Sequence, residues 1–283
     1  MAVSDFLERI SLNDRQISFN RMNKGSVNYF HWHQCLEMLF VTQGYGIVMV
    51  DNQQYTLRPG RLFVFPPFKL HKVFVEQSDK NHYERTTVHL DHLLLDGFLQ
   101  PFPQRRAHFS RLWDSHREAH IFDLTDSAAH IEVILESFNR VQQAETPQWE
   151  DIAMMVLQLM EFMPDQQVKQ KTVSRTTASK VMQWIEENYV QKFALADLSA
   201  SLGLSQSYIS RVFSQETGGS IADYLATRRV KRACELLRST DLSIEAVGQQ
   251  CGFADAPYFI TCFRKLIGRT PLQYRKAAFR LEL

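Results

Sequence analysis

The chain has 283 residues, of which 45% are hydrophobic, and its 32 basic and 31 acidic side chains give a net charge of +1. This composition is ordinary for a globular protein with one large or two smaller domains. Its longest apolar runs, such as LFVF and AMMVLQLM, are too short to span a bilayer, and the charged N-terminus lacks the apolar core of a signal peptide. We therefore expect a cytoplasmic protein with no membrane partner.

The charges are unevenly distributed along the chain. Residues 1–165 carry 15 basic and 21 acidic side chains, whereas residues 179–283 carry 14 basic and 10 acidic ones. A basic C-terminal part favours a partner such as nucleic acid.

The cysteines form no CxxC pair, which is typical of buried thiols rather than of zinc or disulfide sites. They are Cys35, Cys234, Cys251 and Cys262.

The first part of the chain, from Ile17 to Leu90, has the pattern of a β domain. Short β-branched and aromatic runs alternate with turn sequences such as TQGYG and RPG. Many short strands at regular spacing predict a sandwich or barrel over about 17–90. The runs are residues 35–41, 46–50, 54–57, 61–65, 71–75 and 86–90.

The period changes between about 104 and 163. Apolar residues recur three and four apart in 109–122, 128–144 and 149–163, which predicts helices. One of these helices carries an apolar stripe that fits either a dimer interface or packing inside the domain, and both interpretations stay open. The stripe consists of Ile131, Ile134, Leu135 and Phe138. We expect residues 1–163 to form one domain.

A polar stretch without apolar periodicity follows at 164–178, and its composition predicts a linker. The chain is then helical to its end, with breaks at glycines and prolines. We expect a second, all-α domain over 179–277 and a short tail at 278–283.

The second domain contains an internal repeat. RVFSQETGGSIADYLA from Arg211 and TCFRKLIGRTPLQYRK from Thr261 align at an offset of 50 residues. Phe213 then matches Phe263, and Gly218 matches Gly268. A period of this size predicts repeated structural units.

Each repeat has the signals of a helix-turn-helix. In the first unit, about 195–216, Gly203 supplies the turn and Ser205 caps the second helix. In the second, about 243–266, Gly252 supplies the turn and Asp255 the cap, with Pro257 in the first helical turn, where proline is tolerated. A long helix that begins after Ser220 joins the two units.

These features resemble the DNA-binding domain of the AraC/XylS transcription regulators. The resemblance rests on LGLSQSYISRVFSQETGGSIADYLATRRVKRACELL and SIEAVGQQCGFADAPYFITCFRKLIGRTPLQYR, and covers about 179–277. It implies that the second helix of each unit enters the major groove of DNA, and two grooves on one face lie roughly 34 Å apart.

The resemblance also implies which residues contact DNA. Ser207, Ser210 and Arg211 occupy base-reading positions, and Arg suits a guanine edge. The equivalents in the second unit are Pro257, Ile260 and Thr261, and Thr261 departs from the Arg that is frequent in the family. The complete set of expected DNA contacts is Gln206, Ser207, Ser210, Arg211, Ser214, Arg228, Lys231, Arg232, Thr261, Arg264 and Lys265.

The N-terminal β domain contains a second candidate site in HWHQCLEMLFVTQGYG. His31, His33 and Glu37 are spaced by two residues, so on a regular strand they share one face, and His71 follows later. This pattern resembles the cupin signature, and such a set suits a divalent transition metal. With Tyr45, the same residues suit the hydroxyl groups of a small effector.

The two sites together predict an α+β protein in which a cupin-like barrel with flanking helices precedes a double helix-turn-helix domain. We expect a DNA-binding transcription regulator, an activator that responds to a small molecule such as a sugar, and not an enzyme. Its expected partners are double-stranded DNA, the effector, RNA polymerase and a second copy of itself, with no required cofactor. The alternatives are a ligand-independent regulator whose barrel serves assembly, and a metal-dependent cupin enzyme.

Overall fold

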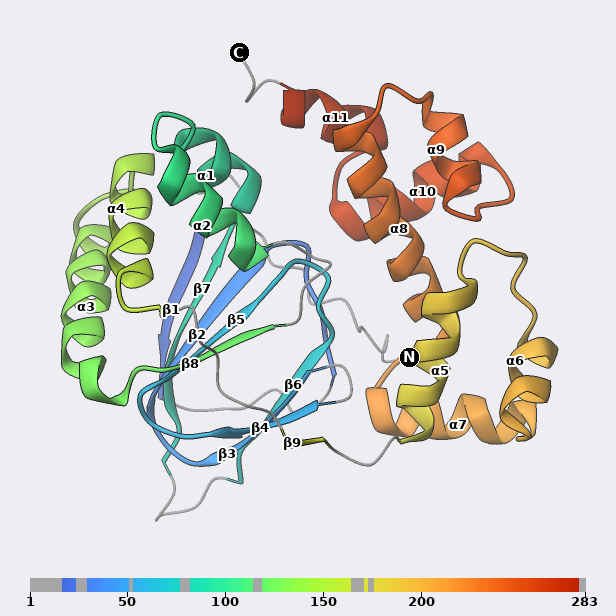
Figure 1. Cartoon of the computed structure of the whole chain (residues 1–283), viewed down its shortest axis with the longest axis horizontal. Helices are drawn as coiled ribbons and strands as arrows, with labels where there is room; N and C mark the ends of the chain where they lie inside the picture. The colour runs from blue at the N-terminus through green and yellow to red at the C-terminus, as the bar shows by residue number, and fades with distance from the viewer. Residues whose placement is uncertain are drawn as a thin grey trace. The chain divides into compact units, whose positions relative to one another are not determined.

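A computed structural model describes residues 17–23, 30–50, 53–76, 82–113, 119–163, 171–172 and 176–279 (Figure 1). The chain divides into two compact units. The first contains residues 10–28 and 35–173, and the second contains residues 29–34 and 174–283. Most of the expected linker, 164–170 and 173–175, and residues 280–283 of the expected tail lie outside the described residues.

The described strands of the first unit form two antiparallel sheets. The larger sheet has the order β1-β7-β2-β5-β8, and the smaller one the order β6-β3-β4-β9. Glu37 on β2 stands opposite Phe65 on β5 and His89 on β7. The strands are β1 (Ile17–Met22), β2 (Leu36–Gln43), β3 (Gly46–Val50), β4 (Gln53–Leu57), β5 (Arg61–Phe65), β6 (His71–Phe74), β7 (Glu84–Leu90), β8 (His120–Asp123) and β9 (Lys171–Thr172).

Alternate side chains of the larger sheet enter two different cores. Met38 and Phe40 of β2 join a core with the helices, whereas Leu39 and Val41 join residues of the smaller sheet in the barrel interior. The period of two in a strand produces this division. Glu37 shares the parity of Leu39, so β2 directs it toward the barrel interior. The helices of this unit are α1 (His92–Phe98), α2 (Pro103–Trp113), α3 (Ala128–Ala144) and α4 (Trp149–Met160).

Between residues 176 and 279, the regular secondary structure of the second unit is helical. Two short helix pairs, α6–α7 and α9–α10, are joined by the longest helix, α8 (Figure 1). The helices are α5 (Thr177–Asn188), α6 (Leu195–Leu202), α7 (Gln206–Thr217), α8 (Ile221–Ser239), α9 (Ile244–Gln250), α10 (Ala256–Ile267) and α11 (Pro271–Phe279).

The expected fold class is confirmed, with four local differences. The helix expected over 109–122 ends at Trp113, and His120–Asp123 instead forms β8, whose partner β5 is distant in sequence. Helix α1 was not expected. Helix α5 begins inside the expected linker, and Lys171–Thr172 of that linker forms β9 on the edge of β4.

The apolar stripe on α3 belongs to the core of the first unit. Ile131, Leu135 and Phe138 are at most 4% exposed and contact the core around β2, with Ile134 packed against it. The stripe therefore stabilises the unit itself and is not available as a dimer surface. Within the described ranges, every helix is too short or too polar to cross a membrane.

Candidate functional sites

The first helix-turn-helix unit is built by a glycine turn and a serine cap. Gly203 ends α6 with a φ of +64°, a left-handed conformation that favours glycine. The Ser199 hydroxyl donates to the Leu204 carbonyl at 2.5 Å across the turn. The Ser205 hydroxyl then accepts from the Tyr208 N–H at 3.3 Å and starts α7.

Helix α7 buries one face and exposes another that is almost entirely polar. Ile209 and Phe213 are fully buried between the helices of the unit. Opposite them lie five exposed side chains with hydrogen-bonding groups, the sequence-predicted contacts Gln206, Ser207, Ser210, Arg211 and Ser214. The arrangement offers donors and acceptors to the edges of base pairs.

The second unit repeats this construction. The Asp255 carboxylate accepts from the Tyr258 N–H at 2.7 Å and starts α10. A Cβ added at Gly248 of α9 would lie 2.9 Å from the ring of Phe259, so only glycine lets α9 approach α10 this closely. The expected contacts Thr261, Arg264 and Lys265 are exposed on α10.

The two units are equivalent at an offset of 50 residues in three dimensions as well as in sequence. Phe213 packs edge-on against Tyr224 with ring centroids 6.1 Å apart, and Phe263 packs in the same way against Tyr274 at 5.6 Å. Helices α7 and α10 each have 12 residues and end at a left-handed glycine. Positions on the two helices can therefore be compared directly.

Arg229 of α8 connects the second helix-turn-helix unit, α9–α10, to the turn between α5 and α6. Its guanidinium donates to the carbonyls of Tyr189 at 2.8 Å and Gln191 at 2.9 Å. It also lies 5.7 Å from the centroid of the Phe253 ring in the second unit. We call this set of contacts the Arg229 clasp. It links the second helix-turn-helix unit to residues that precede the first helix-turn-helix unit.

One member of the basic patch expected on α8, Arg228, is paired within the helical domain. The Arg228 Nε donates to Glu186 at 2.5 Å, and its guanidinium lies 4.0 Å from the centroid of the Tyr189 ring. Burial lowers the pKa of Arg228, but the charge and the hydrogen bond of Glu186, together with Tyr189 and Glu235, outweigh burial, so the pKa is raised. The spacing of three and four puts these cations on one face, and Arg228 on that face contacts Glu186 of α5.

The other two members of the expected patch are also partly covered. Arg232 pairs with Glu235 at 2.9 Å on the same helix, and Lys231 is half-buried. Neither side chain projects freely in the way that Arg211 does on α7. Because Arg228 is paired with Glu186, we expect it to add little to DNA binding, and Lys231 and Arg232 stay predicted DNA contacts.

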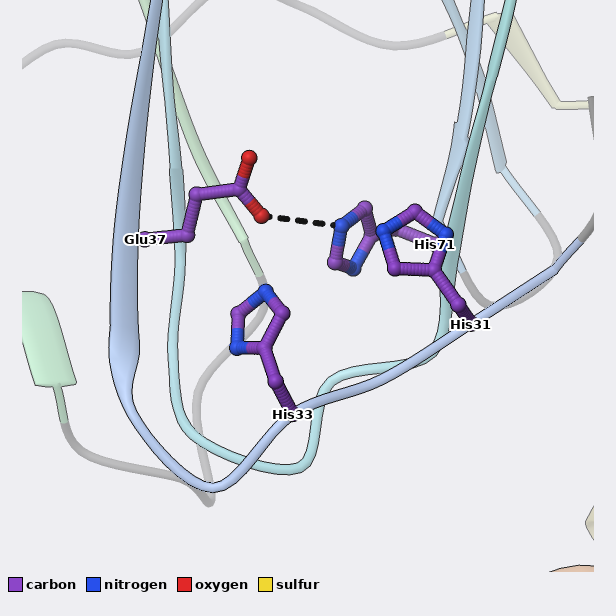
Figure 2. Close-up of side chains that lie close together, drawn as sticks. All are labelled: His31, His33, Glu37 and His71. Atoms are coloured by element: carbon purple, nitrogen blue, oxygen red, sulfur yellow. Dashed lines mark ion pairs between the residues drawn. The ribbon is translucent and has the colours of Figure 1, made fainter. Parts of the chain in front are cut away.

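A buried polar cluster lies at the start of β2 (Figure 2). His31, His33, Glu37 and His71 each offer one nitrogen or oxygen ligand atom, and these atoms lie within 4.8 Å of one another. All four residues are at most 5% exposed. Three imidazoles and a carboxylate form a donor set that suits a divalent transition metal.

The hydrogen bonds of His71 fix its tautomer. Its Nδ1 lies 2.9 Å from the Lys69 carbonyl, which can only accept, so Nδ1 carries a proton. Its Nε2 faces the Glu37 carboxylate at 3.0 Å, and the ring stacks on Phe65 at 4.0 Å. A lone pair on Nε2 facing a carboxylate calls for a proton or a cation between the two groups.

His89 also belongs to this cluster and was not expected from the sequence. Its Nε2 lies 3.6 Å from the Glu37 carboxylate, because β7 pairs with β2 in the register Glu37↔His89. The alternation of β7 indicated an inward position, but only the pairing register shows which residue it meets. His89 therefore holds Glu37 from the side opposite to β5.

Two expectations about this site are wrong. β2 begins at Leu36, and His31 and His33 lie in the irregular segment that leads into it, so they converge with Glu37 without a regular strand. Tyr45 lies in the turn after Gly44, which has a φ of +99°, and is 64% exposed. Tyr45 is thus directed away from the buried cluster.

Comparisons with known proteins identify both parts of the chain. Residues 198–277 match the family described as "Helix-turn-helix domain", and residues 19–82 match "Cupin domain". The HTH-type transcriptional activator RhaS of Klebsiella pneumoniae is 25% identical over 256 residues, covering 87% of each chain. RhaR of Mannheimia succiniciproducens, also an HTH-type transcriptional activator, is 25% identical over 87% of this chain and 86% of its own.

A solved structure resembles the C-terminal part. It is the C-terminal domain of the two-component response regulator yesN from Fusobacterium nucleatum. The two sequences are 40% identical, the match covers 35% of this chain and 99% of that chain, and the TM-score is 0.34.

Proposed function

We propose that this chain, a transcription regulator of the AraC/XylS type with a cupin domain, is a cytoplasmic activator that binds double-stranded DNA through α7 and α10 in response to a small molecule. The observation that carries the DNA contacts is the pair of equivalent helices, α7 and α10, each with one buried face and one exposed polar or basic face. Relatives named as activators support the direction of regulation.

Helix α7 supplies the hydrogen-bonding contacts in this proposal. Arg211 is its only cation, and its guanidinium lies 5.8 Å from the Tyr208 ring centroid, a contact that orients the side chain along the exposed face. A guanidinium there can bind a guanine edge with two parallel hydrogen bonds. Arg264 and Lys265 of α10 supply charge to the DNA backbone.

The test begins with selection of binding sites for the full chain from random DNA. Arg211→Ala should weaken binding to the selected site by about 1–3 kcal/mol, the value of a bidentate base contact, with little effect on scrambled DNA. Arg264→Ala is the matched comparison and should weaken both equally, measured by fluorescence anisotropy at fixed salt. Equal losses on both DNAs for Arg211→Ala would show that Arg211 contacts only phosphate.

We propose residues 1–163 as the effector-binding domain and 179–277 as the DNA-binding domain. A dimer surface on the first domain would have to lie outside the α3 stripe. Glu37, His71 and His89 form a buried polar group suited to hydrogen-bonding the hydroxyls of a sugar. Ligand then shifts the balance between two states of the protein only by its difference in affinity for them. RNA polymerase is the proposed partner in activation.

Calorimetric titration of the full chain with a panel of sugars tests the effector proposal. We expect binding heat with at least one sugar and its loss in Glu37→Ala. A chain that binds none of them, yet still assembles and binds DNA, would favour the alternative in which the barrel serves assembly. Sedimentation velocity of the same protein, with and without the sugar, gives its oligomeric state.

A metal is the second candidate ligand of the cluster, favoured by the convergence of His31, His33, Glu37 and His71. Tetrahedral bonds of about 2.0–2.2 Å place the donors of one ion about 3.3–3.6 Å apart. Binding would therefore draw together the four ligand atoms, which now lie within 4.8 Å of one another. Elemental analysis after dialysis against Zn²⁺ should then give about one ion per chain. The His33→Ala variant should lose that ion. His130 is exposed on α3, so His130→Ala is the control variant and should keep the ion.

A further inference from the structure

The two recognition helices present different chemistry at equivalent positions. On α7 the outward residues are almost entirely polar, whereas α10 has Pro257 and Ile260 where α7 has Ser207 and Ser210. Thr261 likewise replaces Arg211. The outward face of α10 therefore has few groups that can hydrogen-bond a base edge.

Charge is shifted toward the end of α10. Arg264 and Lys265 are exposed where α7 has Ser214 and Gln215. We assign Arg264 and Lys265 to phosphates, which cations bind regardless of sequence, so in this arrangement they add affinity without adding specificity. Any sequence preference of α10 has to arise from its remaining outward residues.

Among these remaining residues, which include Thr261, Ile260 has a side chain that is entirely aliphatic. It is 37% exposed, while its neighbours Phe259 and Cys262 are buried in the unit. It occupies the middle of the outward face, at the position equivalent to Ser210. In the major groove, the C5-methyl group of thymine is the apolar feature that distinguishes one base from the others.

We infer that Ile260 is a specificity-determining residue that contacts a thymine methyl group, so that the half-site of α10 contains a required thymine. This inference rests on the proposed binding of α10 to DNA. In this inference, α7 recognises base edges by hydrogen bonds. Helix α10 contacts a thymine methyl group and is anchored to phosphates by its cations. The half-site of α7 is then defined by hydrogen-bonding edges and the half-site of α10 by a methyl group.

The test replaces single thymines of the selected site by uracil, which removes the methyl group and keeps every hydrogen-bonding group. Binding of the full chain should weaken about fourfold at one thymine, the ratio expected for one buried methyl group. In Ile260→Ala the same replacement should have no effect. Ser210→Ala is the matched control on α7 and should leave the uracil effect at that thymine unchanged.

The possible results separate the two proposals. Uracil effects of equal size in the wild-type chain and in Ile260→Ala, or none at any thymine, would overturn the role of Ile260 while leaving DNA binding intact. A chain that selects no DNA sequence at all would overturn the proposed function, and this inference with it. Because Ile260 is partly exposed, circular dichroism should show Ile260→Ala folded as the wild type.

Discussion

Gly252 is the residue at which a single methyl group should be most damaging to the DNA-binding unit. Its φ is +85°, and a Cβ there would lie 2.6 Å from the Val190 carbonyl oxygen and 2.7 Å from that of Tyr189. Both contacts are with backbone, which cannot rotate away as a side chain can. Gly252→Ala therefore combines a conformational cost with a steric one.

The two costs can be estimated separately. A left-handed conformation costs a residue with a Cβ about 1–2 kcal/mol. Forcing extra volume into a packed site typically costs about 1–3 kcal/mol more. We expect Gly252→Ala to lower the free energy of unfolding of this unit by about 2–5 kcal/mol, and to weaken binding to the complete DNA site.

Gly268→Ala isolates the first cost. Its φ is +80°, nearly the same, but a Cβ there meets no atom within 4 Å. It should lose only about 1–2 kcal/mol. Urea unfolding of the full chain, followed by hydrogen exchange in peptides from α9 and α10, measures both variants. Stabilities of the two variants that agree within about 0.5 kcal/mol would refute the steric argument.

Arg228→Ala should lower the free energy of unfolding by about 1–3 kcal/mol, because a charge-assisted hydrogen bond to Glu186 is lost. The salt dependence of DNA binding should not change, and a slope smaller by about one unit would reveal a phosphate contact. Burial raises the pKa of Cys234 and Cys251 to about 12. Stability should thus fall above about pH 8.5, where only unfolded thiols ionise, and fast iodoacetamide labelling of native protein would contradict this.

The helix-turn-helix units were predictable because their signals are local. The caps at Ser205 and Asp255 and the turns at Gly203 and Gly252 each act within a few residues, and the structure has all four where they were expected. The repeat supplied a second copy of every signal.

Features that depend on distant partners were missed or misjudged. β8 exists because β5 offers it an edge, and nothing near His120 indicates that partner. His89 meets Glu37 only through the register of β7 against β2. On α8, helical spacing grouped Arg228 with its neighbours, but spacing within one helix cannot show that Arg228 faces Glu186 on another helix.

The Arg229 clasp holds the two proposed recognition helices, α7 and α10, at one separation. With the second unit held to the carbonyls of Tyr189 and Gln191, the separation of α7 and α10 is set by the protein and cannot adjust to the DNA. One inserted base pair between the half-sites would turn one of them by about 34–36° around the duplex axis. Regulatory sequences for this protein should therefore share one fixed gap, which makes them searchable in a genome as a pattern of constant length.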